Sequence, residues 1–275
     1  MKTKILITAI HGPYEPWLQI LSEGQLRTWM SPKSGINIVN VFGKKINPKY
    51  QALDQRIYYL RWSKNKAIAY TSLLLEAVSK IIFRANRYRP NVVIETDQKY
   101  GNVWAIQMPD LLVLQGVKNM AVFRESLKHD FDYLVTTITS TYLNLQLLDD
   151  YLTSKPKVSF VGGRIEKSGS MLYPQGSFRV YSRDVVEYIV NNSKKYKHWK
   201  IEDIAMGKLV NKGYCCFENI PHLTLDSTAS LANLTSQDYE SVISYRCKSM
   251  NGKERMDAPI MHLLHRKILS NLSNY

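Results

Sequence analysis

Short apolar runs alternate with longer segments of helical periodicity along this chain. Runs rich in β-branched and aromatic residues predict buried strands over 4–9, 36–42, 91–95, 133–135, 158–161 and 214–218, with a further short one over 57–60. Apolar residues spaced by three and four positions predict helices over 17–30, 66–88, 111–129, 144–153, 202–212 and 259–269. This alternation predicts an α/β fold in which a mainly parallel sheet is sandwiched by helices.

The stretch from 130 to 144 has the strongest local signal for a binding site. Its strand, Tyr133-Leu134-Val135, runs directly into a hydroxyl-rich segment over 136–141. Ligands of open α/β sheets bind at the carboxyl ends of the strands, so this segment is expected to face a ligand. The end of the first strand is expected beside it, where Thr8 and His11 can offer hydrogen bonds to a nucleotide. His11 could equally do no more than cap a loop.

The same stretch resembles nucleotide-sugar glycosyltransferases of the GT-A fold, most of all the β-1,3-galactosyltransferase and Fringe-like group. The group's pattern is Tyr-x-x-Lys-x-Asp-Asp-Asp-x-Phe-Val-Asn, and the frame is kept here at Tyr133, Tyr142, Leu143 and Asn144. The three aspartates, which hold a divalent cation in the family, are replaced by Ile138, Thr139 and Ser140. The loop is also similar to a bacterial and viral branch that carries Ser and Thr there.

Two later blocks extend the resemblance. Residues 173–184 are similar to the family's Tyr-Pro, Gly and Ser-Arg-Asp elements, and Gly176 and Ser177 are the expected acceptor-side residues, with Trp199 farther along. Ser182 is a candidate helix N-cap. Residues 199–207 resemble the family's Glu-Asp-Val-x-x-Gly, so Asp203 is the expected general base, with Glu202 beside it. The alternative is that the two acids only stabilise the start of the helix, where negative charge is favoured by the helix dipole.

Cations are expected to take the place of the metal. The resemblance implies a nucleoside diphosphate leaving group, and arginine geometry suits phosphate oxygens. The expected donor-binding residues are therefore the loop hydroxyls and nearby cations: Thr139, Ser140, Thr141, Lys118, Arg246, Lys248 and Arg255. The alternative is that these cations belong to a general basic surface. No metal and no cofactor is expected, because hard cations prefer carboxylates to hydroxyls.

Composition limits the classes of function. The 275 residues carry 37 basic and 23 acidic side chains, a net charge of +14. A basic surface attracts anionic partners, but no nucleic-acid-binding motif accompanies the scattered cations, so peripheral association with a membrane is favoured over nucleic acid. The three cysteines suit a reducing cytoplasm. The spacing of the histidines does not match a zinc site, which argues against zinc. The sequence also lacks the Gly-x-Ser-x-Gly motif that a hydrolase of the Ser-His-Asp type would carry.

The sequence thus predicts a single domain over 1–275, with a nucleotide-binding half over about 1–140 and an acceptor half over about 141–275. The resemblance implies inverting transfer of a sugar from a nucleotide donor, expected to be a uridine diphosphate sugar, to a glycan or lipid-linked glycan. Two alternatives remain: a sugar-binding domain without turnover, and a basic nucleic-acid-binding module. The latter would bind with a steep salt dependence.

Overall fold

The structure is a computed structural model that describes residues 2–30, 36–44, 48–60, 63–82, 89–198, 201–211, 215–251 and 254–272. The first half holds β1 (Ile5–His11), α1 (Trp17–Gln19), η1 (Ile20–Gln25), β2 (Asn37–Lys44), α2 (Pro48–Leu60), α3 (Lys66–Ile82), β3 (Val92–Asp97), β4 (Gly101–Pro109), η2 (Leu112–Leu114), α4 (Gln115–Ser126), β5 (Tyr133–Ile138) and β6 (Thr141–Leu143). The second half holds α5 (Leu145–Thr153), β7 (Phe160–Ser168), β8 (Met171–Ser182), α6 (Arg183–Asn191), η3 (Ser193–Lys195), α7 (Glu202–Val210), β9 (Cys216–Asn219), β10 (His222–Thr224), α8 (Thr228–Ala232), α9 (Ser236–Ser241), β11 (Ser244–Arg246), β12 (Met250–Asn251), β13 (Glu254–Arg255) and α10 (Asp257–Leu272).

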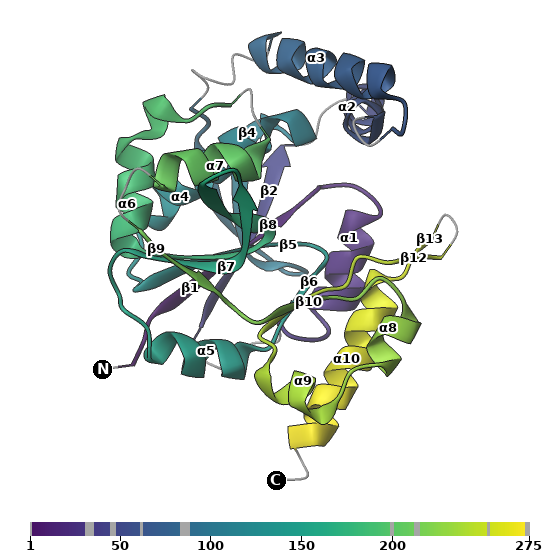
Figure 1. Cartoon of the computed structure of the whole chain (residues 1–275), viewed down its shortest axis with the longest axis vertical. Coiled ribbons are helices and arrows are strands. Elements are labelled where there is room, and N and C mark those ends of the chain that lie inside the picture. The colour runs from purple at the N-terminus through teal and green to yellow at the C-terminus, as the bar shows by residue number, and fades with distance from the viewer. Residues whose placement is uncertain are drawn as a thin grey trace.

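A large mixed sheet forms the centre of the fold (Figure 1). Within the described residues its strand order is β3-β4-β2-β1-β5-β8-β7-β9. Strands β4, β2, β1 and β5 run parallel, whereas β8 joins β5 antiparallel. The predicted α/β class is confirmed: four adjacent parallel strands include β1 and β5, and β7 and β9 form a further parallel pair at the other edge. The carboxyl ends of β1 and β5, near His11 and Ile138, therefore meet at one edge.

Among the described residues, two hydrophobic clusters make up the core, one built around Phe123 and Leu134 and the other around Tyr133 and Val135. Neighbouring residues of β5 belong to different clusters because successive side chains of a strand point to opposite faces. Helices α4, α6 and α7 contribute to the first cluster, and α5 and α10 to the second. Both faces of β5 are therefore buried, as its continuous apolar run predicted.

Several local predictions differ from the structure. Residues 57–60 are the end of helix α2 and not a strand, because Ile57 packs inward while Asp54, one turn earlier, accepts hydrogen bonds from the backbone of the 112–113 turn. Strand β8 was not predicted, and strand β4 was missed as well. Its alternation is interrupted by Trp104 next to Val103, both buried, so it lacks the period of two that marks a half-exposed strand.

The C-terminal segment folds back onto the loop after β5. Strand β11 pairs antiparallel with β6, setting Arg246 opposite Thr141, and the amide of Cys247 donates to the carbonyl of Ser140 at 2.7 Å. Helix α10 then packs against η1 near the N-terminus. Residues about 100 positions apart are thereby brought to one place. No helix in the described part of the chain is long and apolar enough to cross a membrane.

Candidate functional site

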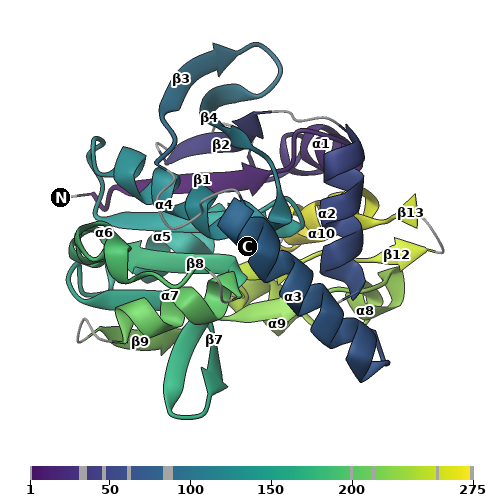
Figure 2. The same cartoon turned by 90° about the horizontal axis from the view of Figure 1, so that it is seen from above.

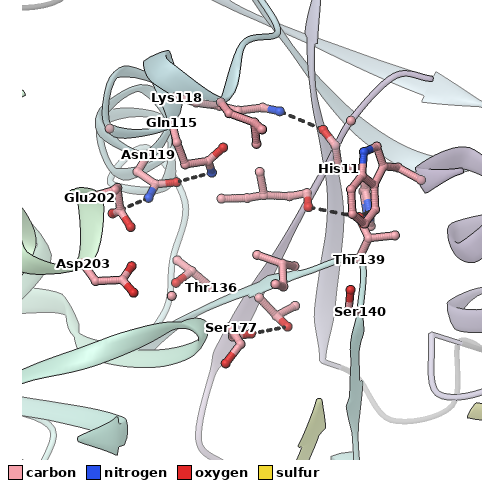
Figure 3. A pocket seen from close by; sticks show the side chains of 18 of the residues that line it. His11, Gln115, Lys118, Asn119, Thr136, Thr139, Ser140, Ser177, Glu202 and Asp203 are labelled. Atoms are coloured by element: carbon pink, nitrogen blue, oxygen red, sulfur yellow. Dashed lines mark hydrogen bonds between the residues drawn. The ribbon is translucent and has the colours of Figure 1, made fainter. Parts of the chain in front are cut away.

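A pocket of about 410 Å³ opens at the carboxyl ends of β1 and β5. Its walls come from the ends of these strands, the first turn of α4, the middle of β8, the start of α7 and the C-terminal segment. In Figure 3, Glu202 and Asp203 lie on one side of the pocket, whereas His11, Thr139 and Ser140 lie on the other. The pocket thus separates an acidic wall from a wall of hydroxyl and imidazole groups.

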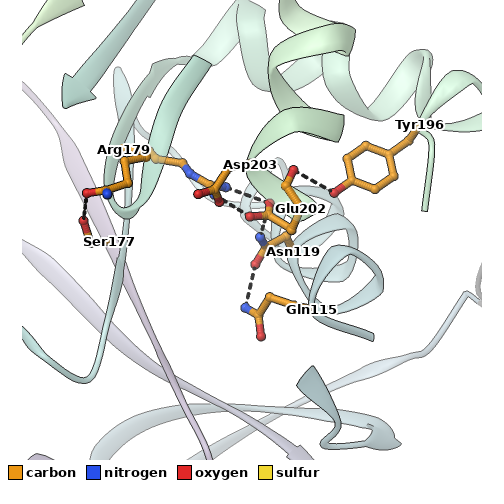
Figure 4. A network of polar contacts seen from close by, with 8 residues as sticks. Gln115, Asn119, Ser177, Arg179, Tyr196, Glu202 and Asp203 are labelled. Carbon is orange, nitrogen blue, oxygen red and sulfur yellow. Dashed lines mark hydrogen bonds and ion pairs between the residues drawn. The ribbon is translucent and has the colours of Figure 1, made fainter. Parts of the chain in front are cut away.

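The acidic wall is organised by one buried arginine. Arg179 on β8, 2% exposed, donates to both oxygens of Glu202, with 2.7 Å between Nη1 and Oε1, and also to Oδ1 of Asp203 (Figure 4). Asn119 of α4 donates to Glu202 as well. Glu202 is therefore enclosed by donors, whereas the side chain of Asp203 stays 29% exposed on the pocket side.

The two carboxyl groups consequently differ in pKa. Burial raises the pKa of Asp203 to about 6, the Arg179 charge opposes that rise, and the neighbouring Glu202 charge adds to it. Burial also acts to raise the pKa of Glu202, but the charge and hydrogen bonds of Arg179 lower it overall. The charge and hydrogen bonds of Arg179 thus favour the anionic form of Glu202, whereas the pKa of Asp203 lies closer to neutral pH.

Two glycines allow this wall to form. A Cβ at Gly176 would lie 2.6 Å from Oδ1 of Asp203 and 2.7 Å from Nη2 of Arg179. A Cβ at Gly207 would lie 2.4 Å from the Cβ of Tyr173, so α7 can approach β8 only with glycine there. The glycine of the Glu-Asp block therefore has a packing role, since it sets the depth at which Asp203 enters the pocket.

The opposite wall is built around a neutral histidine. His11 is buried, and its Nε2 donates to Oδ1 of Asn40 at 2.9 Å, so its Nδ1 accepts from the Thr139 hydroxyl at 3.0 Å. Burial lowers the pKa of His11 to about 3, which keeps the ring uncharged. Lys118 is also buried, and its Nζ donates to the His11 carbonyl and to Asp110. These contacts fix the Thr139 hydroxyl at the end of β5.

Three cations from the described part of the C-terminal segment line the pocket beside this wall: Arg246, Lys248 and Arg255. Arg255 forms an ion pair with the buried Asp257, stacks on Trp17 at 4.8 Å and donates to the Ser140 hydroxyl at 3.1 Å. Burial lowers the pKa of Lys248, and the charges of Arg246 and Arg255 lower it further. The cations repel one another, so an anion placed among them would be stabilised.

Most of the residues predicted from the sequence converge on this pocket. Its lining includes the following of them: His11, Lys118, Thr139, Ser140, Gly176, Ser177, Glu202, Asp203, Arg246, Lys248 and Arg255. Thr8 and Thr141 do not line it, because both are fully buried and their hydroxyls donate to the backbone carbonyls of Val135 and Ser177. Trp199 lies outside the described residues. Ser182 occupies the predicted N-cap position, but its hydroxyl makes no cap bond and instead donates to Asp184.

The residues at the aspartate positions of the resemblance do not fit a divalent cation. Ile138 offers no side-chain ligand, Thr139 is bonded to His11, and Ser140 accepts from Arg255. A guanidinium at the loop is a poor neighbour for a metal, because like charges repel. Among the described residues, no group of three or more His, Cys, Asp and Glu could hold a metal ion.

Sequence reasoning missed Arg179, which positions both acids. The signal was present in the strand Phe178-Arg179-Val180-Tyr181, where a charge interrupts an apolar run. A buried charge must be paired, so such an arginine predicts an acidic partner elsewhere in the chain. Asn119 and Gln115, also in the lining, gave no comparable signal, because amides are common on helix surfaces.

No protein-family model matches this chain, and no curated protein matches it in sequence. Among solved structures, the chain is similar to apo mouse xyloside xylosyltransferase 1, with 7% identity and a TM-score of 0.37 over 90% of this chain and 97% of that one. It is also similar to the apo WbbM bifunctional glycosyltransferase, with 9% identity and a TM-score of 0.44 over 98% of this chain and 51% of that one, so it spans about half of WbbM. Likenesses this distant carry no argument about function, which is therefore argued from the pocket.

Proposed function

We propose that the protein is a GT-A-like glycosyltransferase that moves a sugar from a nucleoside diphosphate donor to a hydroxyl of a glycan, free or lipid-linked. One observation carries the proposal: a single pocket has a carboxylate of raised pKa on one wall and a cluster of cations with hydroxyls on another. Glycosyl transfer needs both, since a proton leaves the acceptor while negative charge develops on the departing diphosphate.

In the proposed reaction Asp203 is the general base. The acceptor oxygen forms a bond to the anomeric carbon, its proton passes to the Asp203 carboxylate, and the bond from the anomeric carbon to the diphosphate oxygen breaks. This single displacement inverts the anomeric configuration. Arg179 and Glu202 position Asp203 and set its pKa, and they are not required to touch the sugar.

The diphosphate would lie against Lys248 and Arg246, with the Ser140 hydroxyl as a further donor, because this hydroxyl accepts from Arg255 and keeps its own proton available. The nucleoside would then extend toward the end of β1 at His11. A uridine nucleotide is the proposed donor, as the resemblance implies, and reaction without a divalent cation is proposed because the loop after β5 carries hydroxyls and a bound guanidinium. The cytoplasm is the proposed location.

The experiment is donor binding followed by turnover. Calorimetric titration with UDP, GDP, CDP and ADP should give saturable binding, tightest for UDP, and release of nucleoside diphosphate from UDP-sugars should depend on an added glycan acceptor. Binding without release with every acceptor tested would instead identify a sugar-nucleotide-binding domain without turnover. Absence of binding to all four nucleotides would overturn the proposal.

A further inference from the structure

Helix α3 is inverted with respect to the usual pattern of a surface helix. Its buried side chains are polar: Ser72 is 1% exposed and Glu76 is 8% exposed. Its outward side chains are large and apolar, namely Ile68, Tyr70, Leu73, Leu74, Leu75, Val78, Ile81 and Ile82, which are 41 to 74% exposed. These eight residues are called the α3 patch below. They make up more than half of the large exposed hydrophobic residues found in the described part of the chain.

The inversion has a structural cause. Ser72 donates to the carbonyl of Ile57 on α2, and Glu76 faces the pocket, so the polar side of α3 is directed to the body of the protein. Helices α2 and α3 pack on each other and on η2, and Figure 1 shows them at the margin of the molecule. Seen from above in Figure 2, α3 lies as the outer element across the body. Within the described part of the chain, the apolar side is therefore exposed.

The sequence around α3 carries charge of mainly one sign. The sequence from 44 to 89 holds eleven basic and two acidic residues. Both acids, Asp54 and Glu76, are buried, whereas Lys64 and Lys66 at the start of α3 are exposed. An apolar face flanked by cations matches an anionic lipid bilayer, whose headgroups attract the cations and whose acyl region takes up the apolar side chains.

We propose that the α3 patch docks the protein onto an anionic membrane surface. A second copy of the chain is a poorer occupant, because pairing the two patches would bring the flanking cations of both copies together. Glu76 of α3 and two residues of the adjoining η2 line the pocket, so docking would place the pocket beside the bilayer. This inference concerns binding and does not depend on the proposed reaction.

The test is co-sedimentation of the full chain with vesicles, measured without donor or acceptor. Vesicles of phosphatidylcholine with 30% phosphatidylglycerol should retain the protein, and pure phosphatidylcholine should retain at least about tenfold less, because the cations contribute only at an anionic surface. Leu74→Gln combined with Ile81→Gln should lower retention by at least about tenfold. Val158→Gln combined with Leu269→Gln, at exposed apolar residues outside α3, is the matched control and should retain wild-type binding.

Four outcomes would overturn the inference, three in sedimentation with vesicles and one in sedimentation velocity. The wild-type chain fails to bind anionic vesicles; it binds both vesicle types equally; or the α3 variant binds as well as the control. Sedimentation velocity is run alongside, and a dimer that the α3 variant dissociates would assign the patch to a second copy instead. Thermal melting of both variants excludes unfolding as the cause. Nucleotide binding is unaffected in every case, so failure here is distinguishable from failure of the proposed function.

Discussion

Arg179 makes two neighbouring carboxylates chemically different. Glu202 accepts hydrogen bonds from both terminal nitrogens of Arg179 and another from Asn119. Asp203 accepts a hydrogen bond from one of these nitrogens, and its side chain stays partly exposed. Pairs of acids whose environments push their pKa values apart are typical of acid–base chemistry. A plain helix-dipole role would need no buried arginine, so this network favours the catalytic interpretation of Asp203.

We predict that Asp203→Asn lowers turnover by about 10²–10⁴, the usual contribution of a positioned general base. The amide keeps the size of the side chain and cannot accept the proton, so nucleotide binding should change by less than about threefold. Steady-state rates and calorimetric titration measure the two effects. Asp150→Asn on the exposed side of α5 is the control. Wild-type turnover in Asp203→Asn would remove this residue from the mechanism.

The pH profile provides a second prediction at the same residue. The base form of Asp203 is its carboxylate, and its pKa is raised to about 6, so turnover should fall as pH drops through about 6 and reach a plateau above it. An unperturbed carboxylate would place this fall near pH 4. In Asp203→Asn the acidic limb should disappear from the residual rate. A limb that persists in the variant would assign the titration to another group.

Prediction from sequence was strongest where a residue's role is local and weakest where it depends on a distant partner. The Glu202-Asp203 pair stands in a recognisable block at the start of a predicted helix, and α7 begins there. Arg179 lies 23 positions earlier, and nothing in its own neighbourhood specifies its partners. Thr8 and Thr141 show the converse, because a hydroxyl at a strand end can face a ligand or the backbone equally well.

Among the elements, α7 and β8 are held together by a contact that only glycine permits. We predict that Gly207→Ala lowers the free energy of unfolding by about 1–3 kcal/mol, because the new methyl group would overlap Tyr173 and overpack the contact. Turnover should fall as well, since α7 carries Asp203. Lys208→Ala, at an exposed position of the same helix, should stay within about 0.5 kcal/mol of wild type in denaturant titration. Equal stability of the two variants would contradict the packing.

The β6–β11 pair brings the C-terminal cations to the pocket. We predict that Lys248→Ala and Arg246→Ala each weaken nucleoside diphosphate binding by about 10–100-fold, the range of a hydrogen bond to a charged group. Nucleoside binding should hardly change, which locates the effect at the phosphates. Lys195→Ala, an exposed cation on η3, is the control. An equal loss of binding in the control would show that the general basic surface, and not these two cations, binds the diphosphate.

The element-scale predictions from sequence succeeded for buried runs and failed where tertiary contacts decide. Strand β5 and helix α10 follow from their own periodicity. Residues 57–60 contain β-prone tyrosines, yet they are helical because α2 packs on η2 and α3. Strand β6 is only three residues long and exists through its pairing with β11, about a hundred positions away, so no local pattern could have predicted it.

At the scale of the whole molecule, the chain closes on itself at the pocket. Segments from the first strand, the middle of the chain and the C-terminal segment all contribute side chains to the lining. Alternation of strands and helices predicted an α/β sheet with a ligand at its carboxyl edge, and the sheet and the pocket lie where that rule places them. The cations of the C-terminal segment were predicted to bind the donor. The pairing that returns this segment to the loop after β5 could not be predicted from the sequence pattern.

This closure leads to the last prediction, which is activity without a divalent cation. The resemblance implies a metal that neutralises the leaving diphosphate as a Lewis acid, and its ligand positions here hold Ile138, Thr139 and Ser140. Arg255 reaches Ser140 from the far end of the chain, and Arg246 and Lys248 lie in the same lining. We expect the cations to provide the neutralising charge, so turnover in excess EDTA should stay within about twofold of the untreated rate.

The measurement must separate loss of metal from loss of charge. Turnover is followed after EDTA treatment, with and without added Mn²⁺ or Mg²⁺, for the wild type and for Lys248→Ala. If the cations replace the metal, EDTA leaves the wild type active and Mn²⁺ partly rescues Lys248→Ala, because a free cation can then occupy the space that the ammonium leaves. Loss of wild-type activity in EDTA, restored by Mn²⁺, would contradict this account and require a carboxylate ligand in the pocket, with Asp203 the first to be tested.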